Sequence, residues 1–287
     1  MLVNGALTTI GAAAQAVSAF GSPAARQIAV GDSQETVPKV SLRDIAARRA
    51  VERRMNDPIP RCDGPRPRAA LFDVDGTLVD TNDLHAAAWR EAFGHFGLDK
   101  PLEEIRWQVG KGGDNLIPTL FPDLADERRE ALEAYRGELF KRDYLPRATP
   151  FPGVRDLFER LASEGVKIVL ASSSHSEEVD YHLSLIGCAD LVSAKTSKDD
   201  VENSKPCPDI FAAALRRVAP LGADEVAVVG DTPWDAKAAA KLGLRIVGFR
   251  SGGFPDEALA EAGACELYDG ASDLLARFDS SVFGRNG

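Results

Sequence analysis

The chain has 287 residues, of which 44% are hydrophobic and 27% are charged, and its formal net charge is −10. This length and composition are typical of a soluble globular protein with room for one large domain and a smaller companion. The acidic balance argues against nucleic acid as the main partner, because a negative surface repels a phosphate backbone. No run approaches the roughly eighteen consecutive apolar residues of a transmembrane helix, so no transmembrane segment is expected.

Residues 1–67 are predicted to form a mostly flexible extension that ends in the Pro-rich linker PIPRCDGPRPR. Its first part lacks the basic region that precedes the apolar run of a signal peptide. Between Lys39 and Arg68, nine basic residues stand against four acidic ones. One arginine-rich helix is expected around Ser41–Met55, with Ser41 as its N-cap. Its arginines could bind an acidic partner or a membrane surface, although a solvated helical arm is the simpler interpretation.

The four cysteines are widely spaced and form no CxxC pair: Cys62, Cys188, Cys207 and Cys265. This pattern fits a reducing compartment better than a disulfide framework or a zinc site. A cytoplasmic protein is therefore expected.

After Arg68, short apolar runs alternate with amphipathic helical patterns, which is typical of a parallel sheet built from crossover connections. The predicted strands are Ala69–Phe72, Val166–Ala171, Leu191–Ala194, Val226–Val229 and Arg245–Val247, with a further edge strand at Ala264–Tyr268. The predicted helices between and after them are Val154–Glu164, Glu177–Ile186, Pro208–Val218, Pro233–Leu242 and Ser272–Phe278. The fold class is therefore α/β.

The interval between the first strand and Gly153 has no convincing strand pattern. Helices are expected at Asn82–Phe96 and Leu124–Tyr144, with short turns of helix from Pro101 and from Asp114. An all-helical subdomain inserted after the first strand explains this interval best. It would lie over the carboxyl edge of the sheet, where open α/β sheets bind ligands.

The sequence FDVDG ends the first strand with two carboxylates. Asp73 and Asp75 are two residues apart, so in an extended chain their side chains point to the same side. Gly76 then permits a sharp turn. A solvated Asp-Gly turn would explain the pattern equally well in isolation. A calcium loop of the EF-hand type does not, because Gly76 comes too early and Leu84 stands where the last carboxylate ligand should be.

Other predicted strands also deliver polar residues at their carboxyl ends. Taken alone, Ser172 could lead into a helix, Asp231 could cap one, and Lys205 could be a solvated turn lysine. Since the carboxyl ends of parallel strands meet at one edge of the sheet, coincidence is the weaker explanation for the whole set. We expect one site that contains Asp73, Asp75, Ser172, Lys205, Asp231 and Asp235.

These motifs resemble those of the haloacid dehalogenase (HAD) superfamily of phosphotransferases, over roughly residues 69–280. The family's DxDGT motif matches Asp73–Thr77, and its strand-ending Ser or Thr matches Ser172. Its lysine in a KPxP context matches Lys205–Pro208, and its GDxxxD motif matches Gly230–Asp235. The resemblance implies a Rossmann-like parallel-sheet core at 68–83 and 150–287, with a helical cap at 84–149.

The resemblance also implies Mg²⁺ held by Asp73, Asp231 and the main-chain carbonyl of Asp75, with Asp235 completing the site or orienting Lys205. Asp73 would be the nucleophile that becomes an aspartyl phosphate, because a bound cation and Lys205 offset the repulsion between two anions. Asp75 would act as general acid and base. Closure of the cap would raise the pKa of Asp75 by excluding water. Ser172 would donate a hydrogen bond to a phosphoryl oxygen.

Substrate-binding residues are expected partly in the cap. The stretch VGKGGD places Lys111, Gly112 and Gly113 just before a helix, where a lysine and exposed backbone N–H groups would suit a polar or anionic substrate. An interhelical loop explains the same glycines. His85 begins the cap, and Ser173 follows the second motif. His95, His175 and His182 have no partner motif and are interpreted as surface or packing residues.

The expected function is hydrolysis of a small phosphorylated metabolite, of the phosphoglycolate or sugar-phosphate type. The stretch GDTPWD and Thr77 follow the pattern of the family's hydrolases, whereas a β-phosphoglucomutase-like mutase is the alternative. A catalytically silent binding protein on the same scaffold is a remote alternative, because such a protein would not need all four motifs. The motifs name neither the individual substrate nor the oligomeric state.

Overall fold

The computed structural model describes residues 62–284. Its centre is a six-stranded sheet in the order β5-β4-β1-β6-β7-β8, in which every neighbouring pair is parallel. The chain enters at the middle of the sheet, builds two strands on one side and then three on the other, as a doubly wound fold does. The strands are β1 (Ala69–Phe72), β4 (Lys167–Ala171), β5 (Ala194–Thr196), β6 (Val226–Gly230), β7 (Arg245–Phe249) and β8 (Ala264–Tyr268).

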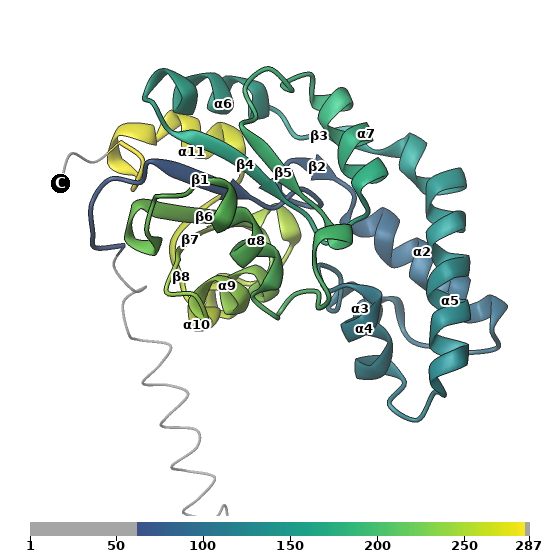
Figure 1. Ribbon diagram of the computed structural model, residues 1–287. Coiled ribbons are helices and arrows are strands. Elements are labelled where there is room, and N and C mark those ends of the chain that lie inside the picture. Colours follow the sequence, from purple (N-terminus) through teal and green to yellow (C-terminus); the bar gives the residue numbers. More distant parts are fainter. Residues whose placement is uncertain (1–61, 285–287) are drawn as a thin grey trace, which may run out of the picture. The chain divides into compact units, whose positions relative to one another are not determined.

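Helices cover both faces of this sheet (Figure 1). Alternate residues of β1 point to opposite faces, so Ala70 and Phe72 join one buried cluster while Ala69 and Leu71 join another. The first cluster includes residues of α6 (Val154–Ser163), α7 (Ser176–Ile186) and α11 (Ala271–Ala276). The second includes residues of α8 (Asp209–Arg217), α9 (Pro233–Ala240) and α10 (Asp256–Ala262). With both faces covered, the central strands β1 and β6 are apolar throughout.

The register of the central strands aligns their carboxyl ends. Phe72 is level with Leu170 of β4 and with Val229 of β6. Side chains that follow these three strands therefore emerge at the same edge of the sheet.

A helical segment, residues 82–147, is inserted between β1 and α6, and we call it the helical insert. Its helices gather beyond one end of the sheet (Figure 1). They are α2 (Asn82–His95), α3 (Leu102–Arg106), α4 (Gly113–Leu120), α5 (Asp126–Leu139), the π-helix η1 (Phe140–Tyr144) and the 3₁₀ turn η2 (Leu145–Arg147). Two short strands, β2 (Val79–Asp80) and β3 (Thr149–Pro150), pair where the chain leaves and re-enters the core. With two residues each, they are too short to show a sequence pattern.

Most predicted elements are confirmed within two or three residues, but one predicted strand is wrong and one helix was not predicted. The strand expected at Leu191–Ala194 is wrong, because β5 begins only at Ala194, while Leu191 and Val192 pack against the core from a loop. Helix α10 was not predicted, since its seven residues are too few for a clear period. The helix expected at Ser41–Met55 lies outside the described residues.

The expectation that the cysteines stay unpaired is wrong for two of them. Cys62 and Cys265 form a disulfide whose Cα atoms are 5.3 Å apart, although 203 positions separate them in the chain. Cys188 and Cys207 are free thiols. The partnership was hidden in the sequence, because only the packing of residues 62–68 near the amino ends of β6 and β7 brings Cys62 to β8. Among the described residues, no helix has the length and apolar character required to cross a membrane.

Candidate active site

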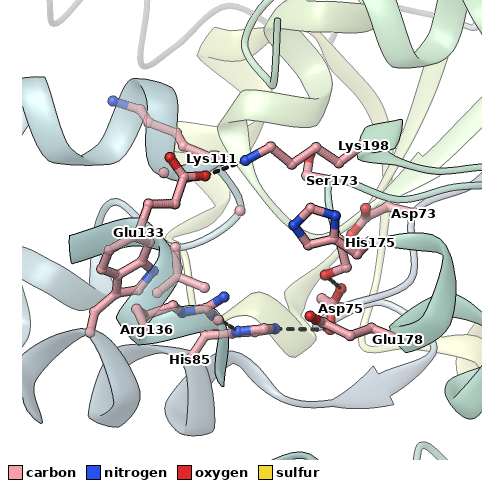
Figure 2. Close-up of a pocket in the computed structure, with 17 residues that line it drawn as sticks. Asp73, Asp75, His85, Lys111, Glu133, Arg136, Ser173, His175, Glu178 and Lys198 are labelled. Carbon is pink, nitrogen blue, oxygen red and sulfur yellow. Dashed lines mark hydrogen bonds and ion pairs between the residues drawn. The ribbon is translucent and has the colours of Figure 1, made fainter. Parts of the chain in front are cut away.

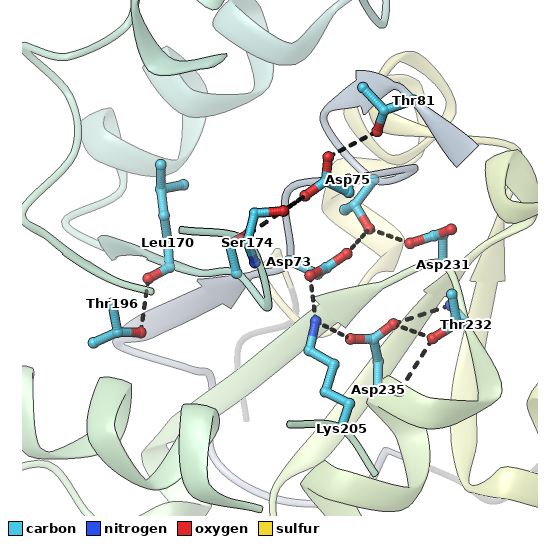
Figure 3. Close-up of polar contacts among 12 residues, drawn as sticks. Asp73, Asp75, Thr81, Leu170, Ser174, Thr196, Lys205, Asp231, Thr232 and Asp235 are labelled. Carbon is cyan, nitrogen blue, oxygen red and sulfur yellow. Dashed lines mark hydrogen bonds and ion pairs between the residues drawn. The ribbon is translucent and has the colours of Figure 1, made fainter. Parts of the chain in front are cut away.

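The carboxyl edge of the sheet brings the predicted motif residues together (Figure 3). Asp73 follows β1, Ser172 follows β4, Asp231 follows β6, and Lys205 comes from the loop between β5 and α8. Asp73 is 4% exposed, Lys205 1%, and Ser172 and Asp231 are fully buried. Charged groups are rarely buried without partners, so their contacts define the site.

Three buried carboxylates converge at this edge. Asp73, Asp231 and Asp235 each place an oxygen within 4.8 Å of the others. Thr77 Oγ1 joins the first two, since it lies 3.2 Å from Asp73 Oδ2 and donates to Asp231 Oδ1 at 2.7 Å. Asn82 Nδ2 donates to the other Asp231 oxygen at 2.7 Å.

Lys205 joins Asp73 to the third carboxylate of the cluster, Asp235. Its ammonium contacts Asp73 Oδ1 and lies 2.7 Å from Asp235 Oδ1. The GDTPWD motif explains how Asp235 is held: Thr232 is the N-cap of α9, and its main-chain N–H donates to Asp235 Oδ2 at 3.1 Å. The Thr232 hydroxyl lies 2.6 Å from the same oxygen. This reciprocal capping arrangement fixes one carboxylate oxygen and leaves the other for Lys205.

The cluster carries more negative than positive charge. Burial, together with the neighbouring carboxylates, raises the pKa of Asp73 well above its ordinary value. Burial and the charge of Asp235 raise the pKa of Asp231 to about 7. Burial alone would lower the pKa of Lys205, but Asp235 and Asp73 raise it, so the lysine stays charged. One ammonium cannot balance three carboxylates, and oxygen ligands of this kind suit a divalent cation such as Mg²⁺.

The Asp75 carboxylate points away from this cluster, toward a group of hydroxyls (Figure 3). Thr81 Oγ1 donates to Asp75 Oδ1 at 2.8 Å, and Ser174 Oγ donates to Asp75 Oδ2 at 2.8 Å. Ser172 Oγ lies 3.4 Å from Asp75 Oδ2 and accepts from the Ser174 main chain. Ser172 is therefore adjacent to Asp75.

Two histidines flank Asp75, and only one was predicted. His85 Nε2 of α2 lies 3.0 Å from Asp75 Oδ1, and His182 Nε2 of α7 lies 3.3 Å from it. The interpretation of His182 as an ordinary packing residue is wrong, since it is fully buried beside Asp75. Its spacing offered a signal: it lies four residues after Glu178, on the same face of α7.

These histidines reverse the expected pKa shift of Asp75. Burial alone would raise the pKa of Asp75, as the sequence led us to expect, but His85 and His182 lower it well below its ordinary value. Asp75 is therefore an anion in this arrangement.

Arg136 of α5 fixes the protonation of His85. Its guanidinium contacts His85 Nδ1, and an arginine can only donate, so Nδ1 accepts and Nε2 carries the proton toward Asp75. The His85 ring stacks on Phe140 at 4.1 Å. Burial is the largest effect on the pKa of His85 and lowers it, and the charge of Arg136 lowers it further. Asp75 raises this pKa, but the pKa still lies below its ordinary value.

A cavity opens beside Asp73 and Asp75, between the sheet edge and the helical insert (Figure 2). The predicted residues His85, Gly112, Gly113 and Ser173 line it. Lys111 also belongs to the lining, but its ammonium is turned away. It lies 2.6 Å from Gln108 Oε1, 3.3 Å from Thr119 Oγ1 and 4.0 Å from the centre of the Trp234 ring.

Several charged residues of the cavity wall carry no motif and were missed by sequence reasoning. They are Glu133 and Arg136 of α5, His175, Glu178 of α7 and Lys198. Charged residues on helices are usually solvated, so only the placement of α5 and α7 around the cavity distinguishes these.

Comparison with known proteins agrees with the geometry. A family model described as haloacid dehalogenase-like hydrolase matches residues 67–243. The phosphoglycolate phosphatase of Cereibacter sphaeroides is 32% identical over 219 residues, which cover 72% of this chain and 97% of the relative. The phosphorylated carbohydrates phosphatase of Thermotoga maritima is 29% identical over 203 residues, with 69% and 93% coverage. The crystal structure of a hydrolase from Pseudomonas syringae matches with a TM-score of 0.70 and 30% identity, covering 75% of this chain and 99% of that one.

Proposed function

Because the chain belongs to the haloacid dehalogenase-like hydrolase family, we propose that it is a magnesium-dependent phosphatase of a small phosphorylated metabolite. One observation carries the proposal: Asp73 belongs both to the buried carboxylate cluster and to the wall of the cavity. A nucleophile in that position can reach a phosphoryl group bound in the cavity, while Lys205 balances the negative charge of the nucleophile. The two relatives named as phosphatases support the same reaction class.

Asp73 and Asp231 would hold Mg²⁺, with the main-chain carbonyl of Asp75, and Asp235 would support the site. The fit rests on charge, since three buried carboxylates face a single ammonium. When bound, the ion would neutralise phosphoryl oxygens and so lower the repulsion between substrate and nucleophile.

Each residue at the carboxyl edge of the sheet would then have its own role in the reaction. An oxygen of Asp73 attacks phosphorus, the bond from phosphorus to the leaving oxygen breaks, and an aspartyl phosphate forms. Lys205 lowers the pKa of Asp73 against the effect of burial and would orient the attacking carboxylate. Ser172 would donate a hydrogen bond to a phosphoryl oxygen. Water then cleaves the aspartyl phosphate and regenerates Asp73.

Asp75 would protonate the leaving oxygen and later deprotonate the attacking water. It begins as an anion, because His85 and His182 hold its pKa low. A phosphoryl group that arrives beside it brings negative charge, which raises the pKa of a neighbouring carboxyl, so Asp75 would take up a proton from solvent before it passes that proton to the leaving oxygen. The helical insert would act as the cap that was expected at residues 84–149, since it supplies His85 and Arg136 to this arrangement.

The test is phosphate release from a panel that contains phosphoglycolate and β-glucose 1-phosphate, with and without Mg²⁺, beside Asp73→Asn. We expect magnesium-dependent release that Asp73→Asn abolishes. A variant that keeps a tenth of wild-type activity would contradict the nucleophile assignment. Conversion of β-glucose 1-phosphate to glucose 6-phosphate without release would indicate a mutase instead, and neither reaction would indicate a silent scaffold.

We also propose a cytoplasmic location. The free thiols Cys188 and Cys207 support it, whereas the Cys62–Cys265 bond argues the other way. A count of free thiols in the isolated protein tests the proposal. Four free thiols would support a reducing compartment, and two would argue against it.

A further inference from the structure

The wall of the cavity beyond Asp75 alternates in charge (Figure 2). Glu133 and Lys198 lie on one side, and Glu178 and Arg136 lie on the other. Two come from helix α5 of the insert, one from α7, and Lys198 comes from the turn after β5. Two cations and two anions therefore surround the space that the non-phosphorylated part of a substrate would occupy.

These charges already compensate one another. The Lys198 ammonium contacts the Glu133 carboxylate across the mouth of the cavity. Glu178 is 2% exposed and its charge raises the pKa of Arg136, while burial lowers it more strongly. The exposed His175 is paired with Asp199 at 2.7 Å. A charged terminal group on the substrate, of either sign, would lose hydration in a partly buried site and would meet no excess of opposite charge, because the two cations and two anions balance.

The wall nevertheless offers unused hydrogen-bonding atoms. Ser173 Oγ and Arg136 Nε are buried and have no hydrogen-bond partner within residues 62–284. Buried polar atoms are costly unless a partner satisfies them, and both residues belong to the lining of the cavity. A hydroxyl group both donates and accepts, so hydroxyls can serve the Arg136 and Lys198 donors and the Glu133 and Glu178 acceptors alike.

We infer that the substrate is a phosphomonoester whose remaining part is an uncharged polyol, that is, a sugar or sugar-alcohol phosphate. The balanced ring of Glu133, Lys198, Glu178 and Arg136 selects it against phosphorylated acids and phosphorylated amines. This inference rests on the proposed phosphatase function and names its substrate class.

Three probes of equal length test the inference, because they differ only in their terminal group. They are 2-hydroxyethyl phosphate, phosphoglycolate and 2-aminoethyl phosphate, with p-nitrophenyl phosphate as a reference for the chemistry. We expect kcat/KM for the hydroxyl probe to exceed that for both charged probes by about tenfold or more. A preference for either charged probe would overturn the inference and leave the phosphatase function intact. No release from any of the four would overturn the proposed function, and the inference with it.

Charge-removing variants test which residues impose the preference. Glu178→Gln leaves the ring with an excess positive charge, so the ratio of kcat/KM for phosphoglycolate to that for the hydroxyl probe should rise about tenfold. Lys198→Gln leaves Glu133 unpaired, so the corresponding ratio for 2-aminoethyl phosphate should rise. Matched controls are Glu177→Gln, whose side chain is 83% exposed and pairs with Lys141, and Lys195→Gln, which pairs with Asp180. Both should keep wild-type ratios.

Thermal melting decides whether each variant is folded. Lys198 lies near the surface, with 26% of its side chain exposed, so its replacement remains informative if Glu178→Gln does not fold. Unchanged ratios in a folded Lys198→Gln protein would overturn the role assigned to the ring.

Discussion

The ammonium of Lys205 lies between two carboxylates, in contact with Asp73 and 2.7 Å from Asp235. One of these carboxylates faces the cavity, while the other is held from behind by the N-cap residue Thr232. Lys205 thus links the proposed nucleophile to the start of α9. Removing it would leave three buried carboxylates without a neighbouring cation.

We expect Lys205→Met to destabilise the metal-free protein by roughly 3 kcal/mol, because unpaired buried charges are strongly unfavourable. Phosphate release should fall as well, since Asp73 loses the cation that orients it. Chemical denaturation and turnover measure the two effects. Lys167→Met is the control, because Lys167 is exposed at the start of β4. Equal stability of the two variants would contradict the role of Lys205 in the cluster.

Magnesium should stabilise the folded protein through the same carboxylates. At about a hundred times its Kd, a ligand that binds only the native state adds about 2.7 kcal/mol to the free energy of unfolding. We expect the melting temperature to rise with Mg²⁺, to fall with a chelator, and to respond far less in Asp231→Asn. A full magnesium response in that variant would place the metal elsewhere.

Asp75→Asn should separate the two halves of the reaction. The p-nitrophenolate leaving group needs no protonation, so phosphorylation of Asp73 by p-nitrophenyl phosphate should persist, while hydrolysis slows by about 10²–10⁴. The phosphorylated protein should then accumulate and be visible by intact mass spectrometry. Normal turnover of Asp75→Asn would remove this residue from the acid–base role.

Gly112 allows the insert to approach the Lys205 loop closely. A Cβ at this position would lie 2.1 Å from Ser204 Oγ and 2.4 Å from Asp114 Oδ1. We expect Gly112→Ala to cost about 1–3 kcal/mol and to lower turnover, because the loop before α4 must shift. Gly94→Ala is the control: a Cβ there meets nothing within 4 Å, and alanine should stabilise α2 by about 1 kcal/mol. A neutral Gly112→Ala would show that the contact is not rigid.

The Cys62–Cys265 bond can be detected directly. Without reductant, the unfolded protein should show two reactive thiols, from Cys188 and Cys207, and four after reduction. Cys62→Ser should lower the free energy of unfolding by roughly 2–4 kcal/mol, because the bond closes a long loop of the unfolded chain. Cys207→Ser is the matched control. Four thiols before reduction would show that the bond does not form.

The sequence by itself determined the α/β class, the central strands and the meeting of Asp73, Asp231 and Lys205. These follow from local physics: apolar runs specify buried strands, and the carboxyl ends of parallel strands share one edge. Asp73 and Asp231 directly follow those strands, so their convergence did not depend on the details of packing, whereas Lys205 reaches the cluster from the loop between β5 and α8.

Only the tertiary structure decided which way side chains away from the strand ends point. It turned the Lys111 ammonium toward Trp234, and it placed His182 beside Asp75. It also joined Cys62 to Cys265 across most of the chain. The reason is the same in each case. The local sequence determines on which face of a helix or loop a side chain lies, but the element that packs against that face is remote in sequence. The charged ring around the cavity belongs to this second class, and with it the substrate class that we infer.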